Sequence, residues 1–292
     1  MLIRKKYLKI QERLGMRVGV AEGIADIPVA KTPTDVLTIL EELYKVGLRA
    51  FLMPQQLFDG IETIQDIYKE HYNNLIKIKN LASKYNIELS LRATSLPDEP
   101  LLDDKLKIYS NIASVMDLRS LVISPNFYKM MPKDQSIRLV VHKINEIIGD
   151  TRIKGKMGIE TTGKTGEVGS TEDIVDIIKR TRATEPVLNW GNIHARGAGG
   201  LRDLSDFDFI INSIRKEITP QWLSNAYLIY SGVAYGPSGL IGKKPIKMSD
   251  LSLEYVIKTI MKFNIKGTLV FDVPHKEKEI VDIIEEFGDM VR

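Results

Sequence analysis

Short apolar stretches alternate with longer amphipathic stretches eight times along this chain of 292 residues. The short stretches have the length and composition of strands, and the long ones have the spacing of helices that cover a sheet. Strands that alternate with helices form a parallel sheet. Eight such units favour a closed barrel over an open sheet, since a (β/α)8 barrel takes about 250 residues. We therefore predict an α/β fold, a single TIM barrel.

The predicted elements follow one another without a linker-like change of composition. We expect strands at 16–21, 49–53, 88–92, 120–124, up to 160, 186–190, 226–231 and 268–272, and helices at 33–46, 61–85, 103–116, 134–148, 171–182, 206–214, 251–263 and 276–287. Residues 1–15 carry a cluster of lysines and arginines and are predicted to be a basic N-terminal extension. Residues 16–292 form the barrel.

Composition limits the class of protein. The net charge of +3 does not by itself indicate a nucleic-acid-binding protein. The absence of cysteine excludes disulfides and thiolate zinc sites, and four histidines are too few for a large imidazole cluster. No apolar run is long enough to cross a bilayer and no secretory signal is evident. We expect a cytoplasmic protein that does not insert into membranes.

The carboxyl ends of the strands meet at one mouth of such a barrel, where its chemistry is found. Glu160 and Asp272 end two of the predicted strands and suit a hard cation or acid–base work, so both are candidate catalytic residues. The structural alternative is that they pair with Arg92 or cap their own loops. The polar residues expected at the mouth are Glu22, Gln55, Arg92, Ser124, Asn126, Glu160, Asn189, Asn192, His194, Tyr230, Asp272 and His275.

Loops six and seven supply the other candidates. His194, in Asn192-Ile-His-Ala-Arg196, is the best placed histidine for ligand binding or general base catalysis, although a loop histidine is as often structural. Positive charge is placed where the phosphate of a ligand would bind by Arg196, Lys243 and Lys244. The alternative is that these charges only keep the loops soluble. We predict ligand contacts from Arg92, Ser124, Asn126, Asn189, Asn192, Arg196, Tyr230, Lys243, Lys244 and His275.

The segment 158–165 also satisfies the P-loop pattern G-x-x-x-x-G-K-[ST]. A P-loop requires a helix that begins at Gly163, because the helix N-terminal amides bind the phosphate. Gly166 and Gly169 lie in what would be its first turns, and each costs about 1 kcal/mol there. The pattern Ser170-x-x-Asp173 marks the start of a helix further along the chain. We therefore interpret this segment as a loop at the mouth of the barrel.

With these segments in place, the chain resembles the endonuclease IV family of xylose isomerase-like TIM barrels, especially its archaeal members. The stretch 158–170 is similar to the strand-five motif that carries a metal-bridging glutamate, here Glu160. The stretch 186–196 resembles the strand-six Asp-x-x-His segment, 229–235 the strand-seven His-Phe-Ser-Gly segment, and 270–275 the closing Glu-Ser-Pro segment. The family binds up to three zinc ions and hydrolyses DNA at abasic sites.

Most of the zinc ligands that this resemblance implies are replaced. The final glutamate is Asp272, the strand-six ligands are Asn189 and Asn192, and Arg92 stands in place of a histidine. Ile229 stands at the strand-seven histidine, Ser124 at the strand-four histidine, and Lys243-Lys244 where the family places acid and imidazole on loop seven. Amides are poor zinc ligands, so a tri-zinc cluster is not expected. We predict at most one weak site for Mg, Mn or Zn, formed by Glu160, Asp272 and Asn189.

Three functions follow as hypotheses. The first is a divergent endonuclease IV-like barrel that binds abasic or single-stranded DNA, or a phosphorylated small molecule, with weak or absent phosphodiesterase activity. The second is a sugar or sugar-phosphate isomerase or epimerase with a single metal ion. The third is a barrel that binds a partner without catalysis. The sequence indicates neither the substrate nor the oligomeric state.

Overall fold

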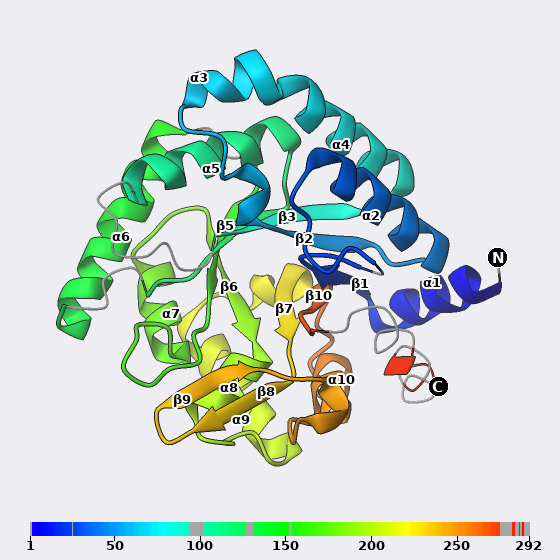
Figure 1. The fold of residues 1–292 in the computed structure, drawn as a ribbon. Helices are drawn as coiled ribbons and strands as arrows, with labels where there is room; N and C mark the ends of the chain where they lie inside the picture. The colour runs from blue at the N-terminus through cyan, green and yellow to red at the C-terminus, as the bar shows by residue number, and fades with distance from the viewer. Residues whose placement is uncertain are drawn as a thin grey trace.

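The computed structural model describes residues 2–24, 26–93, 102–126, 131–151 and 154–274, together with residues 282, 283, 286 and 288. Eight parallel strands close into a barrel in the order β1-β10-β7-β6-β5-β4-β3-β2 (Figure 1). The predicted TIM barrel is thereby confirmed. Its strands are β1 (Met16–Ala21), β2 (Ala50–Pro54), β3 (Glu88–Ala93), β4 (Ser120–Ile123), β5 (Lys156–Glu160), β6 (Thr184–Asn189), β7 (Ala226–Tyr230) and β10 (Gly267–Phe271).

Helices surround the barrel on its outer face (Figure 1). The α-helices are α1 (Leu2–Leu14), α2 (Pro33–Val46), α3 (Ile64–Asp66), α4 (Tyr72–Tyr85), α5 (Leu102–Met116), α6 (Lys133–Asp150), α7 (Thr171–Lys179), α8 (Trp190–Arg196), α9 (Leu204–Glu217) and α10 (Leu253–Lys262). A π-helical turn, η2 (Ile67–His71), and three 3₁₀ turns, η1 (Gln55–Phe58), η3 (Pro220–Asn225) and η4 (Ile246–Met248), complete the order. The predicted helix 276–287 lies outside the continuously described residues. None of the described helices is both long and apolar enough to cross a membrane.

Alternation along the strands divides the core into two layers. Side chains on one face of the strands fill the barrel interior, and those on the other face pack against the helices. The interior cluster consists of Ala21, Leu52, Val122, Val187, Tyr227, Ile229 and Val270. Gly158 belongs to this interior layer, because a Cβ there would lie 2.6 Å from Val187 Cγ2 and 2.7 Å from Ser120 Oγ. The two-residue period then places Glu160 inside the barrel as well.

The helix predicted to follow Ser170 is α7, which begins at Thr171 with Ser170 as its N-cap. The Ser170 Oγ accepts the backbone N–H of Asp173, and a carboxylate oxygen of Asp173 accepts the N–H of Ser170 in return. This capping box satisfies amides that the first turn of α7 would otherwise leave unpaired. Because the N-cap of α7 lies ten residues after Glu160, residues 161–169 remain as a loop at the mouth.

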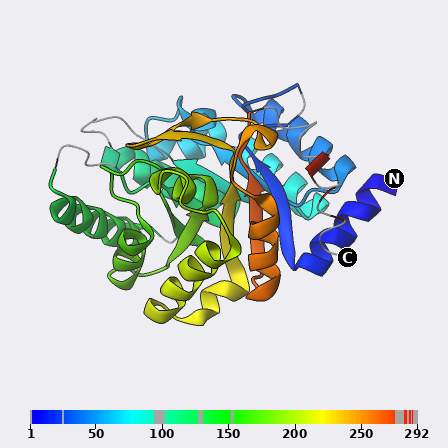
Figure 2. The ribbon, with the colours of Figure 1, turned by 90° about the horizontal axis from the view of Figure 1, so that it is seen from below.

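Two connections contain elements that the sequence analysis did not predict. Strand β6 ends at Asn189 and α8 follows at once, because the Asn189 side chain accepts the backbone N–H of Asn192 as an N-cap. The loop 232–249 contains an antiparallel hairpin of β8 (Val233–Gly236) and β9 (Gly239–Lys243). The hairpin lies across one end of the barrel (Figure 2).

Helix α1 packs on the barrel through one face. Tyr7 and Ile10 are buried, and the buried Gln11 side chain donates to the Gly47 carbonyl at 2.8 Å and accepts the N–H of Val18 at 2.9 Å. The basic side chains of Lys5, Lys6, Lys9 and Arg13 are exposed on the opposite face. The N-terminal segment is therefore an amphipathic helix held against the first two β/α units.

Candidate functional site

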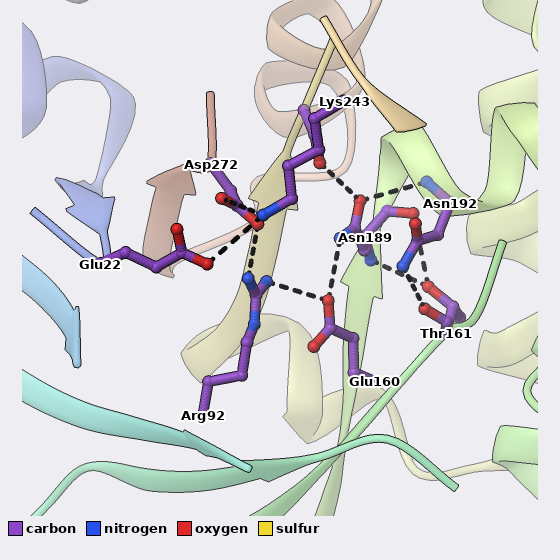
Figure 3. Close-up of polar contacts among 9 residues, drawn as sticks. Glu22, Arg92, Glu160, Thr161, Asn189, Asn192, Lys243 and Asp272 are labelled. Carbon is purple, nitrogen blue, oxygen red and sulfur yellow. Dashed lines mark hydrogen bonds and ion pairs between the residues drawn. The ribbon is translucent and has the colours of Figure 1, made fainter. Parts of the chain in front are cut away.

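A buried arginine joins the two predicted acids. Arg92, near the end of β3, donates from Nη1 to Asp272 Oδ2 at 2.5 Å and from Nη2 to Glu160 Oε1 at 3.0 Å. All three side chains are at least 94% buried. Figure 3 shows the guanidinium between the two carboxylates. The pairing with Arg92 that the sequence left open as a structural alternative is therefore present.

A second cation reaches Asp272 from the hairpin. Lys243, the last residue of β9, places Nζ 2.7 Å from Asp272 Oδ1 and 3.5 Å from Glu22 Oε1 (Figure 3). Both carboxylate oxygens of Asp272 therefore face a positive charge. Burial alone would raise the pKa of Asp272, but Arg92 and Lys243 outweigh burial and hold this pKa well below its ordinary value. Asp272 is a carboxylate at every physiological pH.

Glu160 has one engaged oxygen and one without a partner. Its Oε1 accepts both Arg92 and, at 2.8 Å, Asn189 Nδ2. Its Oε2 is buried and has no hydrogen-bond partner. Leaving a buried carboxylate oxygen unpaired costs free energy, and such a group in a native structure calls for an explanation. Among the described residues predicted at the mouth, Glu160 Oε2 shares this unused hydrogen-bonding capacity with Arg92 Nε, Gln55 Oε1 and His194 Nε2, and of these four it is the carboxylate oxygen.

Asn189 is held in one orientation by its neighbours. Its Oδ1 accepts Ser231 Oγ at 3.1 Å and the backbone N–H of Asn192 at 3.1 Å, so its Nδ2 must face Glu160. Its backbone N–H donates to Thr161 Oγ1, and Asn192 Nδ2 donates to the Thr161 carbonyl (Figure 3). Asn189 and Asn192, both predicted as ligand contacts, thus position Glu160 and the β5 loop.

Two residues of this network were missed by the sequence analysis. Ser231 follows Tyr230, which was predicted to contact a ligand, and Thr161 follows Glu160. Ser231 could have been found from the alternation of side chains along a strand. Ile229 faces the barrel interior, and Ser231, two residues further on, lies on the same face. Tyr230 faces outward instead, and its hydroxyl donates to the Leu251 carbonyl at 2.6 Å. The structure therefore places Ser231, and not Tyr230, at the mouth.

The other predicted residues lie apart from the Arg92 cluster. Ser124 Oγ donates to Asn126 Oδ1, and Asn126 Nδ2 donates to Glu167 Oε2. Lys244 pairs its backbone N–H with the Gly232 carbonyl. His275 lies outside the described residues. Within the described part of the chain, six residues of the predicted set form one connected group of side-chain contacts, namely Glu22, Arg92, Glu160, Asn189, Lys243 and Asp272. Asn192 joins them indirectly, through Thr161.

His194 and Arg196 bind the protein itself. The buried His194 accepts the N–H of Leu201 at Nδ1, and its Nε2 lies 3.3 Å from Asp250 Oδ1. Arg196 donates to Thr162 Oγ1 and to the carbonyls of residues 164, 165 and 167. These contacts connect α8 with the β5 loop and with the segment after the hairpin. Both side chains are used to fix loops around the mouth.

Glu22, at the end of β1, has a strained backbone. Its φ is 66°, in the left-handed region that side-chain-bearing residues avoid. Because glycine relieves a left-handed cost of about 1–2 kcal/mol but loses about 0.5–1 kcal/mol through its freer unfolded chain, we expect Glu22→Gly to be about 0.5–1 kcal/mol more stable than Glu22→Ala. Urea unfolding of both variants measures the difference. Equal stabilities would show that the residue is not strained.

Comparisons with known proteins identify the fold. No protein-family model matches the chain. An uncharacterized protein of Methanocaldococcus jannaschii is 21% identical over 275 residues, which cover 92% of this chain and 97% of that one. A D-tagatose 3-epimerase-like protein superposes with a TM-score of 0.65 at 15% identity, over 94% of this chain and 98% of that one.

Two further structures concern ligands. D-psicose 3-epimerase from Clostridium cellulolyticum H10, solved with D-tagatose, has a TM-score of 0.61 at 11% identity over 88% of this chain and 85% of that one. The IolI protein with a bound zinc atom has a TM-score of 0.61 at 13% identity over 94% and 95%. Xylose isomerase domain proteins are among the similar structures. The xylose isomerase-like TIM barrel expected from the resemblance is confirmed, and the endonuclease IV assignment within it stays a prediction.

A divalent ion does not fit the mouth as its side chains lie. Both oxygens of Asp272 and one oxygen of Glu160 are engaged by cationic or amide donors, and Asn189 directs its oxygen toward Ser231. Arg92 stands between Glu160 and Asp272 and would repel a dication placed between these two carboxylates. In the part of the chain that the structure describes, no three acidic, histidine or cysteine side chains form a set of metal ligands. The predicted ligands Glu160, Asp272 and Asn189 serve the ion network instead.

Proposed function

We propose that this protein is an isomerase or epimerase of sugars or sugar phosphates in which Glu160 moves a proton to and from a carbon next to a carbonyl group. The observation that carries the proposal is the buried Glu160 Oε2, which lacks a partner while Oε1 is fixed by Arg92 and Asn189. A carboxylate held by one oxygen presents the other as a general base. The epimerases that share the fold support this substrate class.

The reaction conserves every atom. Glu160 removes the proton from the carbon, the C–H electron pair forms a C=C bond, and the carbonyl oxygen takes up the negative charge of an enediolate. Return of the proton by Glu160 to the neighbouring carbon, together with transfer of the hydroxyl proton of the enediolate to the former carbonyl oxygen, gives the isomer. The epimer forms when a solvent proton is added to the opposite face of the original carbon and Glu160 releases its proton to solvent. The negative charge on oxygen needs a fixed positive partner, and Arg92 and Lys243 are the two cations within the network. No oxidant or reductant is required.

The cost of the ion network supports a functional role. Moving several charges from water into a barrel interior carries a desolvation cost in free energy that apolar side chains of similar volume do not have. Buried ion pairs are therefore a poor way to stabilise a fold. Arg92, Glu160 and Asp272 are each at least 94% buried. Perturbed charged groups that converge at the mouth of a barrel are typical of active sites.

The nucleic-acid hypothesis has less support. It relied on Arg92, Arg196, Lys243 and Lys244 for contacts with phosphate. Arg92 lies 6% exposed between two carboxylates, and the guanidinium of Arg196 is occupied by the β5 loop. Lys243 is paired with Asp272. Three of the four cations thus have internal anionic or carbonyl partners, which compete with the phosphates of DNA.

The proposal predicts exchange of carbon-bound hydrogen with solvent. Protein incubated in D₂O with D-fructose, D-tagatose or D-psicose, or with their phosphate esters, should add one mass unit to at least one of these sugars and form its isomer. Proton NMR and mass spectrometry measure both products. Protein heated to loss of structure is the control for spontaneous exchange. If every sugar in the panel stayed unlabelled, and none raised the melting temperature, the assignment would fail.

A further inference from the structure

Lys243 is delivered to the mouth by a hairpin that is itself fixed at several points. The Leu240 N–H donates to the Gly163 carbonyl at 2.8 Å, and the Val233 N–H donates to Ser249 Oγ at 3.2 Å. Gly239 pairs with Lys164 in an isolated antiparallel bridge. The hairpin is therefore tied to the β5 loop on one side and to η4 on the other. This arrangement holds the ammonium group of Lys243 near Asp272.

The position of Nζ is the one that a bound cation would occupy. It lies 2.7 Å from Asp272 Oδ1 and 3.5 Å from Glu22 Oε1, so two carboxylates from different strand ends converge on it (Figure 3). Hard divalent ions are commonly held by one or two carboxylates with water and substrate oxygens completing the shell. The protein's own lysine fills this place.

We infer that Lys243 is an internal replacement for a divalent metal ion: its ammonium group occupies the cation position between Asp272 and Glu22 and supplies the charge that stabilises negative oxygen in the substrate. The second half of this inference rests on the proposed function. The first half concerns only the protein and can be tested without a substrate. A similar barrel, the IolI protein, was solved with zinc, so a metal ion can be held by this architecture.

The strained backbone at Glu22 supports the inference. A non-glycine residue kept at a φ of 66° costs free energy, and strain of this kind is concentrated at functional sites. The Glu22 carboxylate is directed toward Lys243 rather than toward bulk solvent, with 29% of its side chain exposed. The carboxylates of Glu22 and Asp272 therefore both face the ammonium group of Lys243.

The inference predicts that removal of the ammonium group creates a metal site. We expect Lys243→Met to bind Mn²⁺ at least tenfold more tightly than the unchanged protein, since two carboxylates then face each other without their shared cation. Lys244→Met is the matched control, because this neighbouring lysine contributes its backbone, and no described side-chain contact, to the mouth. Electron paramagnetic resonance of free Mn²⁺ and isothermal titration calorimetry measure binding to the full-length protein.

A double variant identifies which side chains bind the Mn²⁺ ion. Adding Glu22→Gln to Lys243→Met should return Mn²⁺ affinity to the level of the unchanged protein, whereas Lys243→Arg should never gain it. Equal Mn²⁺ binding by the unchanged protein, Lys243→Met and Lys244→Met would overturn the inference. So would a gain that survives Glu22→Gln. None of these results depends on turnover, so a failure here is distinguishable from failure of the sugar-isomerase proposal.

Discussion

Replacing Arg92 by leucine is expected to destabilise the protein by about 3–5 kcal/mol, because it leaves two buried carboxylates without the cation they share. Glu160 would keep only Asn189 as a partner, and Asp272 would keep Lys243. Urea unfolding at pH 7, followed by circular dichroism, measures the loss. Arg92→Lys should lose less stability, because lysine keeps the positive charge. It should still lose some, because an ammonium group cannot donate to both acids with the geometry of the guanidinium.

The effect of Arg92→Leu should depend on pH. The folded pKa of Asp272 is depressed, so its contribution to stability is fully present above its unfolded pKa of about 3.9 and is lost as the pH falls toward the folded value. The difference between the unchanged protein and the variant should therefore be largest at neutral pH and narrow below about pH 4. Arg180→Leu is the control, because this arginine forms an exposed pair with Asp176. A similar loss in both variants would contradict the buried network.

Replacing Glu160 by glutamine should reduce exchange of the sugar hydrogen by about 10²–10⁴-fold, which is the range lost when a general base is removed. The change preserves the size of the side chain, and Arg92 keeps Asp272, so the fold should persist. Rates of deuterium incorporation and circular dichroism spectra measure both properties. Glu217→Gln, the same change at an exposed position on α9, should leave exchange unaffected. Unaltered exchange in Glu160→Gln would remove this residue from the chemistry.

The barrel could be predicted because the pattern of a strand followed by a helix is repeated along the chain. Eight short apolar stretches alternate with helices, and the capping box at Ser170 and Asp173 fixed where one of the helices begins. The strand ends, and hence the acids at the mouth, followed from that pattern. Glu160 and Asp272 were found in this way, although they lie far apart in the sequence and their strands, β5 and β10, are not neighbours in the barrel.

The side-chain partners at the mouth depended on information that local patterns do not contain. The direction of Tyr230 was misjudged because a strand end alone does not show which face a residue takes; the buried neighbour Ile229 settles it. Lys243 was expected to contact a ligand, yet its Nζ lies on Asp272 because a hairpin folds over the mouth. The sequence analysis placed Lys243 in a loop and did not predict the hairpin.

The most direct test of this account is the metal dependence of exchange in the sugar that the panel identifies. Deuterium incorporation should proceed at the same rate in excess EDTA as in the presence of Mn²⁺, because Arg92 and Lys243 supply the positive charge at the mouth. Metal analysis of the EDTA-treated protein verifies that no ion is carried over. Exchange that disappears in EDTA and returns with Mn²⁺ would show that a divalent ion performs the role assigned here to the protein's own cations.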